Sequence, residues 1–401
     1  MKIALALSTI LCGASAAMLA QVAPSGTTGA SKLAYALRYS QTAVISGGAG
    51  DQQRAIASGT LDYLTASQRL PFSLTLSGGY SMVLSGASSR STGFENLLVA
   101  QGIVFRSSSL RFTDGISYLP QAPTTGFSGI PGTGEPNGPS SPNLPNQSIL
   151  TVDTSTINNQ SSGAFEHTIN RAMSFTITGG ADLLIYPDGN GIGTTTYTGA
   201  AGLSQRLDAR NSLSYHYLYT DYSYATTNMA INTQSAMVGY TRRWTRQIDT
   251  SISAGPLIRN SSNSQTIPST TDYSLDAIIS DTYRSGSASL VYNHGTNGGG
   301  GYLIGAVADS IDASLTREYG PRTSVNFQVG YRRTAGLSHN GVTNTEFATA
   351  VAHKHLGRDF SVYGSYSLSD QSTSSSLPSN ALGSLDQVIS VGIEFSSTHS
   401  H

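Results

Sequence analysis

After its N-terminal region, the chain alternates apolar and polar residues with a period of two. Val325, Phe327 and Val329, for example, are separated by Asn326 and Gln328. Successive side chains of a β-strand point to opposite faces, so this pattern predicts strands with one apolar and one polar face. No long window has the 3.6-residue period of an amphipathic helix, and we therefore expect an all-β protein.

The alternating segments are numerous and short. We count about eighteen of them, with sixteen as the alternative. They are centred near residues 38, 60, 75, 101, 113, 166, 179, 201, 217, 239, 252, 278, 290, 309, 327, 350, 365 and 390.

The connections between these segments differ in a regular way. Every second one is tight and contains arginine, whereas the others are longer and rich in Gly, Ser, Asn and Thr. Short turns at one end and long loops at the other are typical of an antiparallel transmembrane β-barrel, with periplasmic turns and extracellular loops. We therefore predict a single barrel over residues 21–401.

A barrel satisfies the constraints that lipid imposes on a backbone. Every N–H and C=O group must be paired within the protein, so the strands must close on themselves. Eighteen strands of about 9–11 residues need roughly 180 residues, which the chain provides with enough left for loops. A β-propeller or β-helix is the main rival, although no repeated blade signature is visible.

The composition supports a membrane barrel rather than a soluble domain. Only 11% of the residues are charged, against roughly 25% in ordinary soluble domains. The net charge of −1 does not favour nucleic-acid binding, so we expect no nucleic-acid partner. No run of 18 apolar residues occurs, which excludes a helical membrane protein.

Residues 1–20 have the pattern of a secretory signal peptide. Lys2 precedes a short apolar run, and Ala16, Ala17 and Ala20 offer small-residue cleavage sites. A buried N-terminal helix is the alternative. Cys12, the only cysteine, falls within this segment, so the exported chain would contain no disulfide.

Arginine is concentrated in the tight turns. Guanidinium groups at one rim would bind phospholipid phosphates of the inner leaflet by charge-assisted hydrogen bonds, and Arg forks phosphate better than Lys does. The alternative is that turns are simply polar. The twelve arginines of this predicted periplasmic rim are Arg69, Arg106, Arg171, Arg206, Arg210, Arg242, Arg243, Arg246, Arg284, Arg317, Arg322 and Arg358.

The last segment is an amphipathic strand that ends in phenylalanine. Ile389, Val391, Ile393 and Phe395 share one face. Such a terminal strand resembles the signal that the outer-membrane assembly machinery reads, although six residues follow Phe395 here. An edge strand of a soluble sheet is the alternative.

Residues 119–148 form a long loop that holds seven of the fourteen prolines. Proline cannot donate to a strand ladder, so this segment is not a strand. It belongs to the long-loop side and could fold into the lumen, with Phe127 and Ile130 against the wall and Glu135 as its only charge. A solvent-exposed surface loop is the alternative.

Motifs of catalysis are absent. No serine lies in a G-x-S-x-G elbow, and no phosphate-binding G-x-x-x-x-G-K-[ST] occurs, because the run 298–301 lacks Lys and reads as a hairpin loop. His353 and His355 share a strand face but lack further ligands at metal spacing. We therefore expect no catalytic residues, no metal and no cofactor.

One charged residue breaks the alternation. Asp114 falls on the apolar positions of Leu110, Phe112 and Ile116. Two explanations are open: a bulge at Gly115 shifts the register, or Asp114 lies near the rim.

Four motifs carry a resemblance to a known group of proteins. YLPQAPTTGFSGIPGTG (118–134), RRWTRQIDTSISAGP (242–256), NHGTNGGGGYLIGA (293–306) and VISVGIEF (388–395) resemble segments of predicted outer-membrane β-barrel proteins from Gram-negative bacteria. The resemblance covers nearly all of the exported chain. It implies an outer-membrane location and a barrel fold, but no activity and no functional residues.

The strand count is what connects fold to function. Barrels of 16 to 18 strands enclose an aqueous channel, so we expect passive diffusion of small hydrophilic solutes, with little charge selectivity from a neutral lining. A plugged structural barrel, or an export port whose loops or periplasmic rim bind envelope partners, is the alternative. The expected partners are outer-membrane lipids, the assembly machinery and, as an open option, further copies of the chain.

Overall fold

The computed structural model describes thirteen stretches of the chain. The predicted signal peptide, most of the loop 119–148 with Phe127, Ile130 and Glu135, and Arg106 lie outside them. The described residues are 31–46, 52–65, 67, 69–85, 92–105, 107–119, 155–189, 191–225, 227–263, 265–300, 303–338, 341–374 and 386–400.

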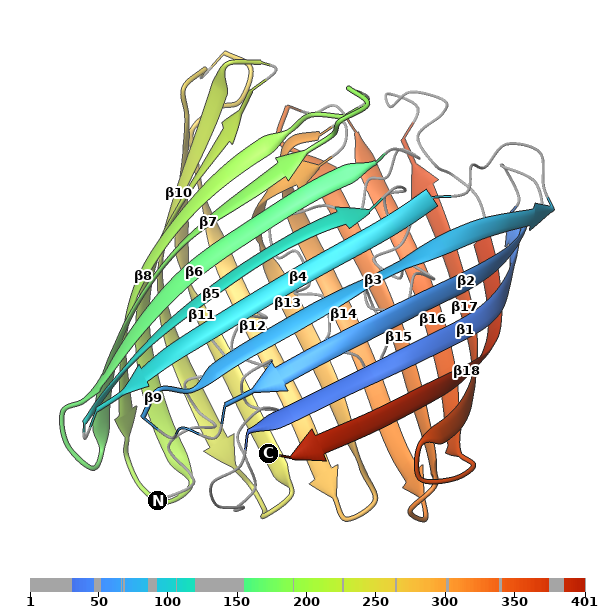
Figure 1. Ribbon diagram of the computed structural model, residues 1–401. Helices are drawn as coiled ribbons and strands as arrows, with labels where there is room; N and C mark the ends of the chain where they lie inside the picture. The colour runs from blue at the N-terminus through green and yellow to red at the C-terminus, as the bar shows by residue number, and fades with distance from the viewer. Residues whose placement is uncertain are drawn as a thin grey trace.

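Eighteen antiparallel strands form one closed barrel, which confirms the predicted fold and strand number (Figure 1). Each predicted segment centre falls within one strand. The strands are β1 (Lys32–Ser46), β2 (Gln52–Leu64), β3 (Phe72–Ser85), β4 (Thr92–Val104), β5 (Ser108–Leu119), β6 (Thr156–Thr168), β7 (Met173–Ile185), β8 (Thr194–Arg206), β9 (Asn211–Tyr224), β10 (Met229–Arg243), β11 (Ile248–Ser261), β12 (Thr270–Tyr283), β13 (Gly286–Gly300), β14 (Leu303–Tyr319), β15 (Thr323–Gly336), β16 (Val342–His355), β17 (Phe360–Thr373) and β18 (Asp386–Ser400).

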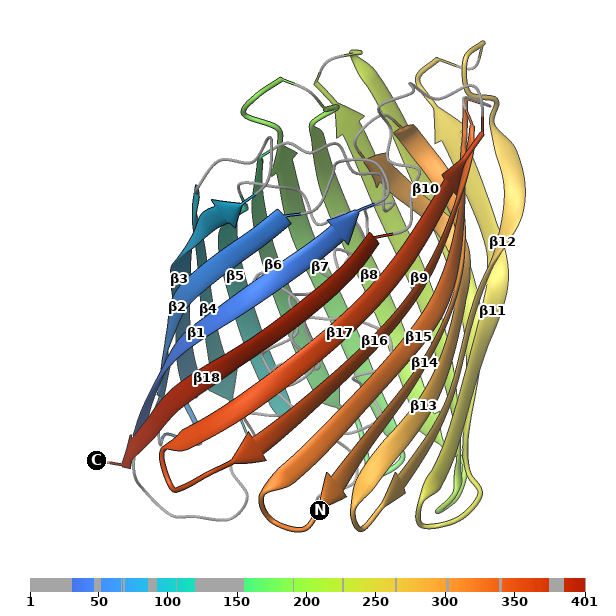
Figure 2. The ribbon, with the colours of Figure 1, turned by 90° about the vertical axis from the view of Figure 1, so that its right-hand side faces the viewer.

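The first and last strands close the barrel. β1 pairs with β18 along its full length, from Lys32 opposite Ser400 to Ser46 opposite Asp386. Figure 2 shows the two strands side by side, tilted strongly against the barrel axis like their neighbours. The Phe395 ring packs edge-on against Phe360 on β17 at 5.1 Å between centroids, which adds aromatic contact at the closure.

The two ends of the barrel differ, largely as predicted. At one end the connections are short, from the two residues 284–285 to the seven residues 65–71. At the other end most are longer, but 225–228 and 301–302 are as tight as the turns opposite. The rule of one long loop per hairpin is therefore wrong for β9–β10 and β13–β14.

Several short turns share one hydrogen-bond pattern. The N–H of Ile169, Trp244 and Leu356 each donates to the carbonyl oxygen four residues later, at 2.9–3.0 Å. In the β8–β9 turn, the Asp208 carboxylate accepts the Asn211 side-chain amide at 2.7 Å and the Arg210 N–H at 2.6 Å. These hydrogen bonds, that of Asn211 first, hold the pKa of Asp208 below its ordinary value.

The faces of the barrel follow the alternation. Large apolar side chains such as Leu37, Tyr80 and Val329 are exposed on the outside, while Ser40, Thr345 and Ser390 are buried inside. The side-chain arrangement is thus the opposite of that in a soluble protein, because the apolar side chains face outward and the polar ones face inward. Within the described residues, no helix has the length and apolarity to cross a membrane.

Candidate functional site

The inner wall of the barrel is lined with hydroxyl groups. Inward-facing Ser and Thr side chains on neighbouring strands hydrogen-bond to each other, as Thr42 does to Ser390 at 3.0 Å. The hydroxyl oxygens of Thr241 and Ser251 are likewise 3.0 Å apart, and either hydroxyl can donate to the other. A wall of hydroxyls can bind water and neutral polar solutes without imposing a strong charge preference.

Several charged side chains on the inner wall occur in pairs. Arg38 Nε donates to Glu394 Oε2 at 2.5 Å across the β1–β18 closure. Arg332 Nη2 lies 3.8 Å from Asp312 Oδ1, and the Arg332 guanidinium lies over the Phe347 ring. Pairing reduces the field that each charge exerts on a solute in the lumen.

One hairpin leaves the barrel wall near the long-loop end. β13 pairs with β12 only as far as His294 opposite Leu275. Beyond this point, β13 continues to pair with β14 up to Gly300 opposite Leu303. Residues 270–274 of β12 keep only their partner strand β11 on the other side. The wall therefore opens between β12 and β13, and the hairpin tip is free to lean inward.

The hairpin tip packs against strands on the far side of this opening. Ile304 and Val307 of β14 contact a buried apolar cluster formed by Tyr222, Tyr224, Ile231, Ile267 and Leu337. Gly305, at φ +65°, approaches so closely that an added Cβ would lie 2.7 Å from Ile231 Cδ1. β9 and β10 are three or more strands away from β13 in the sheet order. Contact between them requires the hairpin to lie across the lumen.

Two tyrosine hydroxyls hold the tip in place. Tyr224 Oη donates to the Gly298 carbonyl at 2.7 Å, and Tyr222 Oη donates to the Thr296 carbonyl at 3.4 Å. Both tyrosines lie on the inward positions of β9, whereas Tyr215, Tyr217 and Tyr219 face outward. Residues 295–300 and 303–305 of this hairpin are thus anchored as a constriction of the upper lumen, and Figure 2 shows orange strand ends inside the mouth of the barrel.

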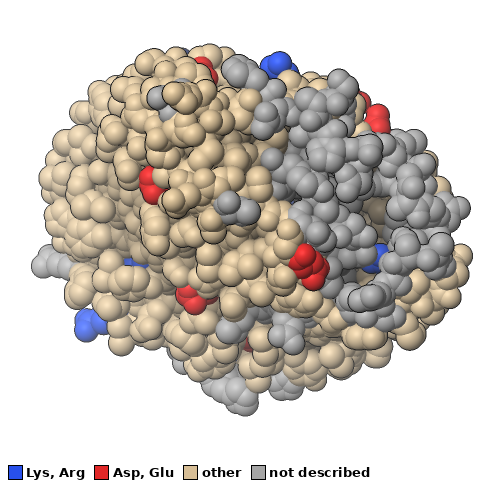
Figure 3. All heavy atoms as spheres, turned by 90° about the horizontal axis from the view of Figure 1, so that it is seen from above, with Lys and Arg blue, Asp and Glu red and all other residues tan. Residues whose placement is uncertain are grey.

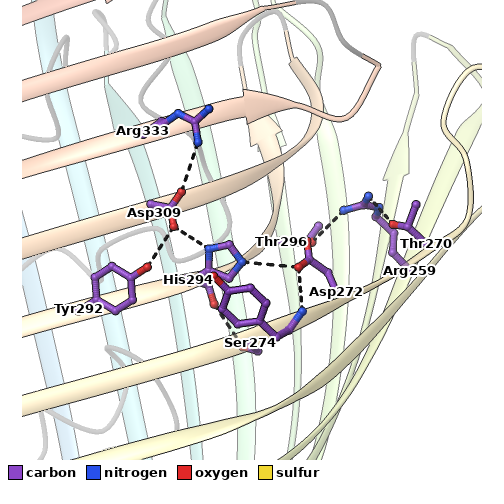
Figure 4. Close-up of polar contacts among 10 residues, drawn as sticks. Arg259, Thr270, Asp272, Ser274, Tyr292, His294, Thr296, Asp309 and Arg333 are labelled. Carbon is purple, nitrogen blue, oxygen red and sulfur yellow. Dashed lines mark hydrogen bonds and ion pairs between the residues drawn. The ribbon is translucent and has the colours of Figure 1, made fainter.

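A polar cluster bridges the opening at the base of the hairpin (Figure 4). His294 Nδ1 lies 2.6 Å from Asp309 Oδ1, and its Nε2 lies 3.8 Å from Asp272 Oδ1. The imidazole stacks on the Tyr273 ring at 4.2 Å between centroids. Arg333 Nη1 lies 3.9 Å from the other Asp309 oxygen. These contacts tie β12 to β15 where backbone pairing has stopped.

Arg259 completes the cluster from the inner side. Its guanidinium donates to Thr270 Oγ1 at 2.6 Å and to Thr296 Oγ1 at 3.3 Å, which links β11 and β12 to the departing part of β13 (Figure 4). No three His, Cys, Asp or Glu side chains of the described residues are arranged to hold a metal ion. We interpret the cluster as structural: its side-chain contacts hold β12 and β13 together where their backbone pairing has ended.

The described residues at the long-loop end carry few charges. Seen from above, their atoms include only scattered Lys, Arg, Asp and Glu side chains (Figure 3). This described part of the face, like the hydroxyl wall below it, offers little charge for attracting ions of one sign.

The predicted arginine rim maps to the short-turn end, except for Arg106, which is outside the described residues. Arg69, Arg171 and Arg358 lie in turns and are exposed. Arg242 lies 4.0 Å from the Trp244 ring centroid. Seven of the eight short turns, or the strand end beside them, also expose an apolar residue that continues the outward alternation: Leu70, Phe105, Ile169, Leu207, Trp244, Tyr319 and Leu356.

The sequence did not indicate that the β13–β14 hairpin reaches into the lumen. It treated 298–301 as a plain hairpin loop, and its candidate for a pore loop, residues 119–148, lies almost entirely outside the described residues. The available signal was Tyr222 and Tyr224, which interrupt the small polar positions on the inward side of β9. Large inward side chains near a strand end indicate that something packs against them.

Comparison with known proteins finds similar structures but no similar sequences. No model of a protein family matches the chain, and no curated protein matches its sequence. OccK2 (OpdF) of Pseudomonas aeruginosa is similar in structure, with a TM-score of 0.51 at 11% identity, over 92% of this chain and 98% of that one. OccK9 (OpdG) of the same organism has a TM-score of 0.50 at 9% identity, over 92% and 98%.

A third neighbour comes from another organism. OccAB2 of Acinetobacter baumannii has a TM-score of 0.50 at 8% identity, over 92% of this chain and 98% of that one. The fold therefore defines the class: the chain is an 18-stranded antiparallel barrel like these three. At such low identity the likeness is one of fold.

Proposed function

We propose that the protein is an outer-membrane channel for passive diffusion of small hydrophilic solutes. The observation that carries this proposal is the closed 18-stranded barrel with an apolar outside and a hydroxyl-lined inside. A barrel of this strand number is too wide to be filled by its own wall side chains. The structural neighbours belong to outer-membrane porins, which supports both the location and the activity.

The lining favours small polar solutes that are not strongly charged. Hydroxyl groups on the wall can replace the hydrogen bonds that a polar solute makes with water. Several of the inward charges are paired, as Arg38 is with Glu394. The neighbour OccK2 (OpdF) has been crystallised in complex with glucuronate, a small polar sugar acid. It resembles the proposed solutes in size and in its many hydroxyl groups, and differs from them in the negative charge of its carboxylate.

Export and assembly follow from the same proposal. Residues 1–20 would direct the chain out of the cytoplasm and be removed. The outward residues Ile389, Val391, Ile393 and Phe395 of β18 would be read by the assembly machinery before β18 pairs with β1. No catalytic role is assigned to any residue.

Conductance of the purified protein tests the channel. Reconstituted in a planar bilayer, it should open ion-permeable steps, and liposomes that contain it should swell in isotonic neutral sugar. A matched preparation unfolded by heat before reconstitution should do neither. Protein that inserts as a folded barrel but passes neither ions nor sugar would refute the proposal.

The inward hairpin favours one alternative, a plugged barrel whose loops bind an envelope partner. Deletion of residues 121–147 distinguishes the two. A channel should widen and conduct more current, whereas a binding scaffold should lose its partner with no change in conductance.

A further inference from the structure

A histidine lies between two carboxylates at the opening in the barrel wall (Figure 4). Asp309 of β14 is 2.6 Å from His294 Nδ1, and Asp272 of β12 is 3.8 Å from its Nε2. The first contact stays within the paired strands β13 and β14. The second crosses the opening, because β12 and β13 pair no further than Leu275 and His294. The Nε2 side of the ring therefore faces the strand from which the inward hairpin separates.

The charge of the imidazole decides what its Nε2 side can do. A neutral imidazole has one N–H, and the short contact with Asp309 Oδ1 places this N–H on Nδ1. Nε2 then presents a lone pair to the Asp272 carboxylate, which has only lone pairs itself. Nε2 is accordingly buried without a hydrogen-bond partner, in a side chain that is only 9% exposed. A protonated imidazole has an N–H on both nitrogens and attracts both carboxylates.

Two tyrosines complete the surroundings of the ring. The Tyr273 ring of β12 stacks on the imidazole at 4.2 Å between centroids, a position that favours a cation over an aromatic face. The Tyr273 N–H donates to Asp272 Oδ1 at 2.8 Å, and Tyr292 Oη donates to Asp309 Oδ1 at 3.2 Å. None of these groups supplies a positive charge to the Asp272 carboxylate across the opening.

Two arginines lie at the edges of the cluster. Arg333 of β15 is 3.9 Å from the second oxygen of Asp309, but its side chain is 53% exposed, so water and salt screen its charge. Arg259 of β11 interacts electrostatically with Asp272, while its guanidinium donates to two threonine hydroxyls. Arginine keeps its charge throughout, whereas histidine is the side chain that changes charge between about pH 5 and pH 8.

We propose that His294 is a pH-sensitive link between the inward hairpin and the barrel wall. In mild acid the charged imidazole joins Asp309 to Asp272 and holds the base of the hairpin against β12. As the pH rises and the imidazole loses its proton, the attraction to Asp272 is lost and the hairpin moves away from β12 more readily. The effect on current rests on the proposed channel function, whereas the movement does not.

A spin label at the hairpin tip tests the movement without any current. Asn297→Cys, labelled with a nitroxide in lipid nanodiscs, should give a spectrum that becomes more mobile between about pH 5 and pH 8. With His294→Gln added, the spectrum should be mobile at both pH values, because Gln carries no charge. A label that is equally mobile at both pH values beside an intact His294 would overturn the proposal.

The same change of pH should alter single-channel currents. Transitions to a larger conductance should be about tenfold more frequent at the higher pH, which is the effect of one charge-assisted contact. His294→Gln should remove this dependence. His353→Gln is the matched control, because His353 lies near the short-turn end of β16, away from the hairpin. Full pH dependence in the first variant, or its loss in the second, would contradict the link.

Asp272→Asn distinguishes a change of charge from a purely structural role. The Asn amide can donate to the lone pair of a neutral Nε2, so the link should now form at the higher pH. The hairpin should therefore become less mobile as the pH rises, which is opposite to the wild-type response. A response equal to that of the wild type would show that Asp272 is not the partner. Circular dichroism checks that each variant is a folded barrel.

A disulfide across the opening should abolish the response. A Cβ added at Gly295 would lie 3.6 Å from Ser274 Oγ, so Gly295→Cys with Ser274→Cys can form a bond there. The oxidised barrel should show currents independent of pH, and reduction should restore the dependence. A response that persists after oxidation would refute the link. A pH-dependent label in a barrel without current would contradict the channel alone, and a conducting barrel with a pH-independent label would contradict the link alone.

Discussion

At the scale of residues, parity along the strand decides the environment of a side chain. Val329 is 56% exposed on the outside of β15, while the adjacent Gln328 faces the lumen. Neighbours in sequence thus face different solvents. The same chemical change should therefore have opposite consequences at the two positions.

Val329→Arg places a charge in the middle of the lipid-facing band. We expect it to lower the free energy of unfolding by about 2–4 kcal/mol, the range for arginine near the midplane of a barrel. Gln328→Arg, one position away, should cost much less. Urea unfolding in lipid vesicles measures both. Equal losses would show that the outside of the barrel does not face hydrocarbon.

Tyrosine is used differently on the two faces of β9. Tyr224 is buried and anchors the hairpin tip through Gly298, whereas Tyr219 is exposed to lipid. Tyr224→Phe should lower the free energy of unfolding by about 1 kcal/mol, because the Gly298 carbonyl loses its donor. It should also increase current fluctuations in single-channel recordings. Tyr219→Phe serves as the control, and identical recordings from both variants would argue against the anchor.

At the scale of elements, the β13–β14 hairpin is the part that narrows the upper lumen. It leaves β12 after His294 and is held by the Tyr222 and Tyr224 hydroxyls. Beyond His294 the hairpin pairs only with itself and is no longer part of the wall. Its tip can therefore be changed without disturbing the wall below.

Deletion of residues 297–304 should widen the channel. Gly305 and Ala306 would then form a two-residue turn between Thr296 and Val307, which are already paired. We expect a larger single-channel conductance with the same number of strands. Circular dichroism checks that the strand content persists. Unchanged conductance in a folded barrel would mean that the hairpin does not limit flow.

The β8–β9 turn gives a prediction about pH. The pKa of Asp208 is lowered in the folded state by its hydrogen bonds with Asn211 and Arg210, so its stabilising effect is present above the pKa of the unfolded chain and is lost as the pH falls through the folded pKa. Asp208→Ala should lower the urea midpoint at pH 7, and the difference should vanish in strong acid.

Asn170 provides a control that does not titrate. Its Oδ1 accepts the Ala172 N–H at 2.8 Å in the β6–β7 turn. Asn170→Ala should shift the urea midpoint by an amount that does not change with pH. If Asp208→Ala behaves in the same way, its carboxylate is not the stabilising group.

At the scale of the whole molecule, the two ends are chemically different. The short-turn end carries arginines beside exposed apolar side chains, and the described residues of the long-loop end carry few charges. We expect the arginine end to bind phospholipid phosphates of the inner leaflet. This asymmetry would set the orientation of the barrel.

Replacing three rim arginines tests the lipid contact. Arg171→Gln, Arg246→Gln and Arg358→Gln together should reduce the retention of anionic phospholipid by the purified barrel, as measured by native mass spectrometry. The same three changed to Lys should retain an intermediate amount, because charge remains while the fork geometry is lost. Equal retention in all three proteins would contradict the proposed rim.

Particular elements show which features of the structure can be predicted from the sequence. The alternation through 324–331 indicates a strand and its faces, because parity depends only on adjacent residues. Asp114 shows the limit, since its position on an apolar face suggested a bulge or a rim. Only the register with β4 and β6 places it in the middle of the barrel's outer surface.

The number of strands, their order and the apolar outside of the barrel were determined by the sequence alone. Each of these depends on local period and on the presence of turn residues. The inward hairpin was decided by the tertiary structure. Its position depends on which distant strands closure brings together: the large inward Tyr224 indicates that something packs against it, but only the structure shows that its partner is Gly298.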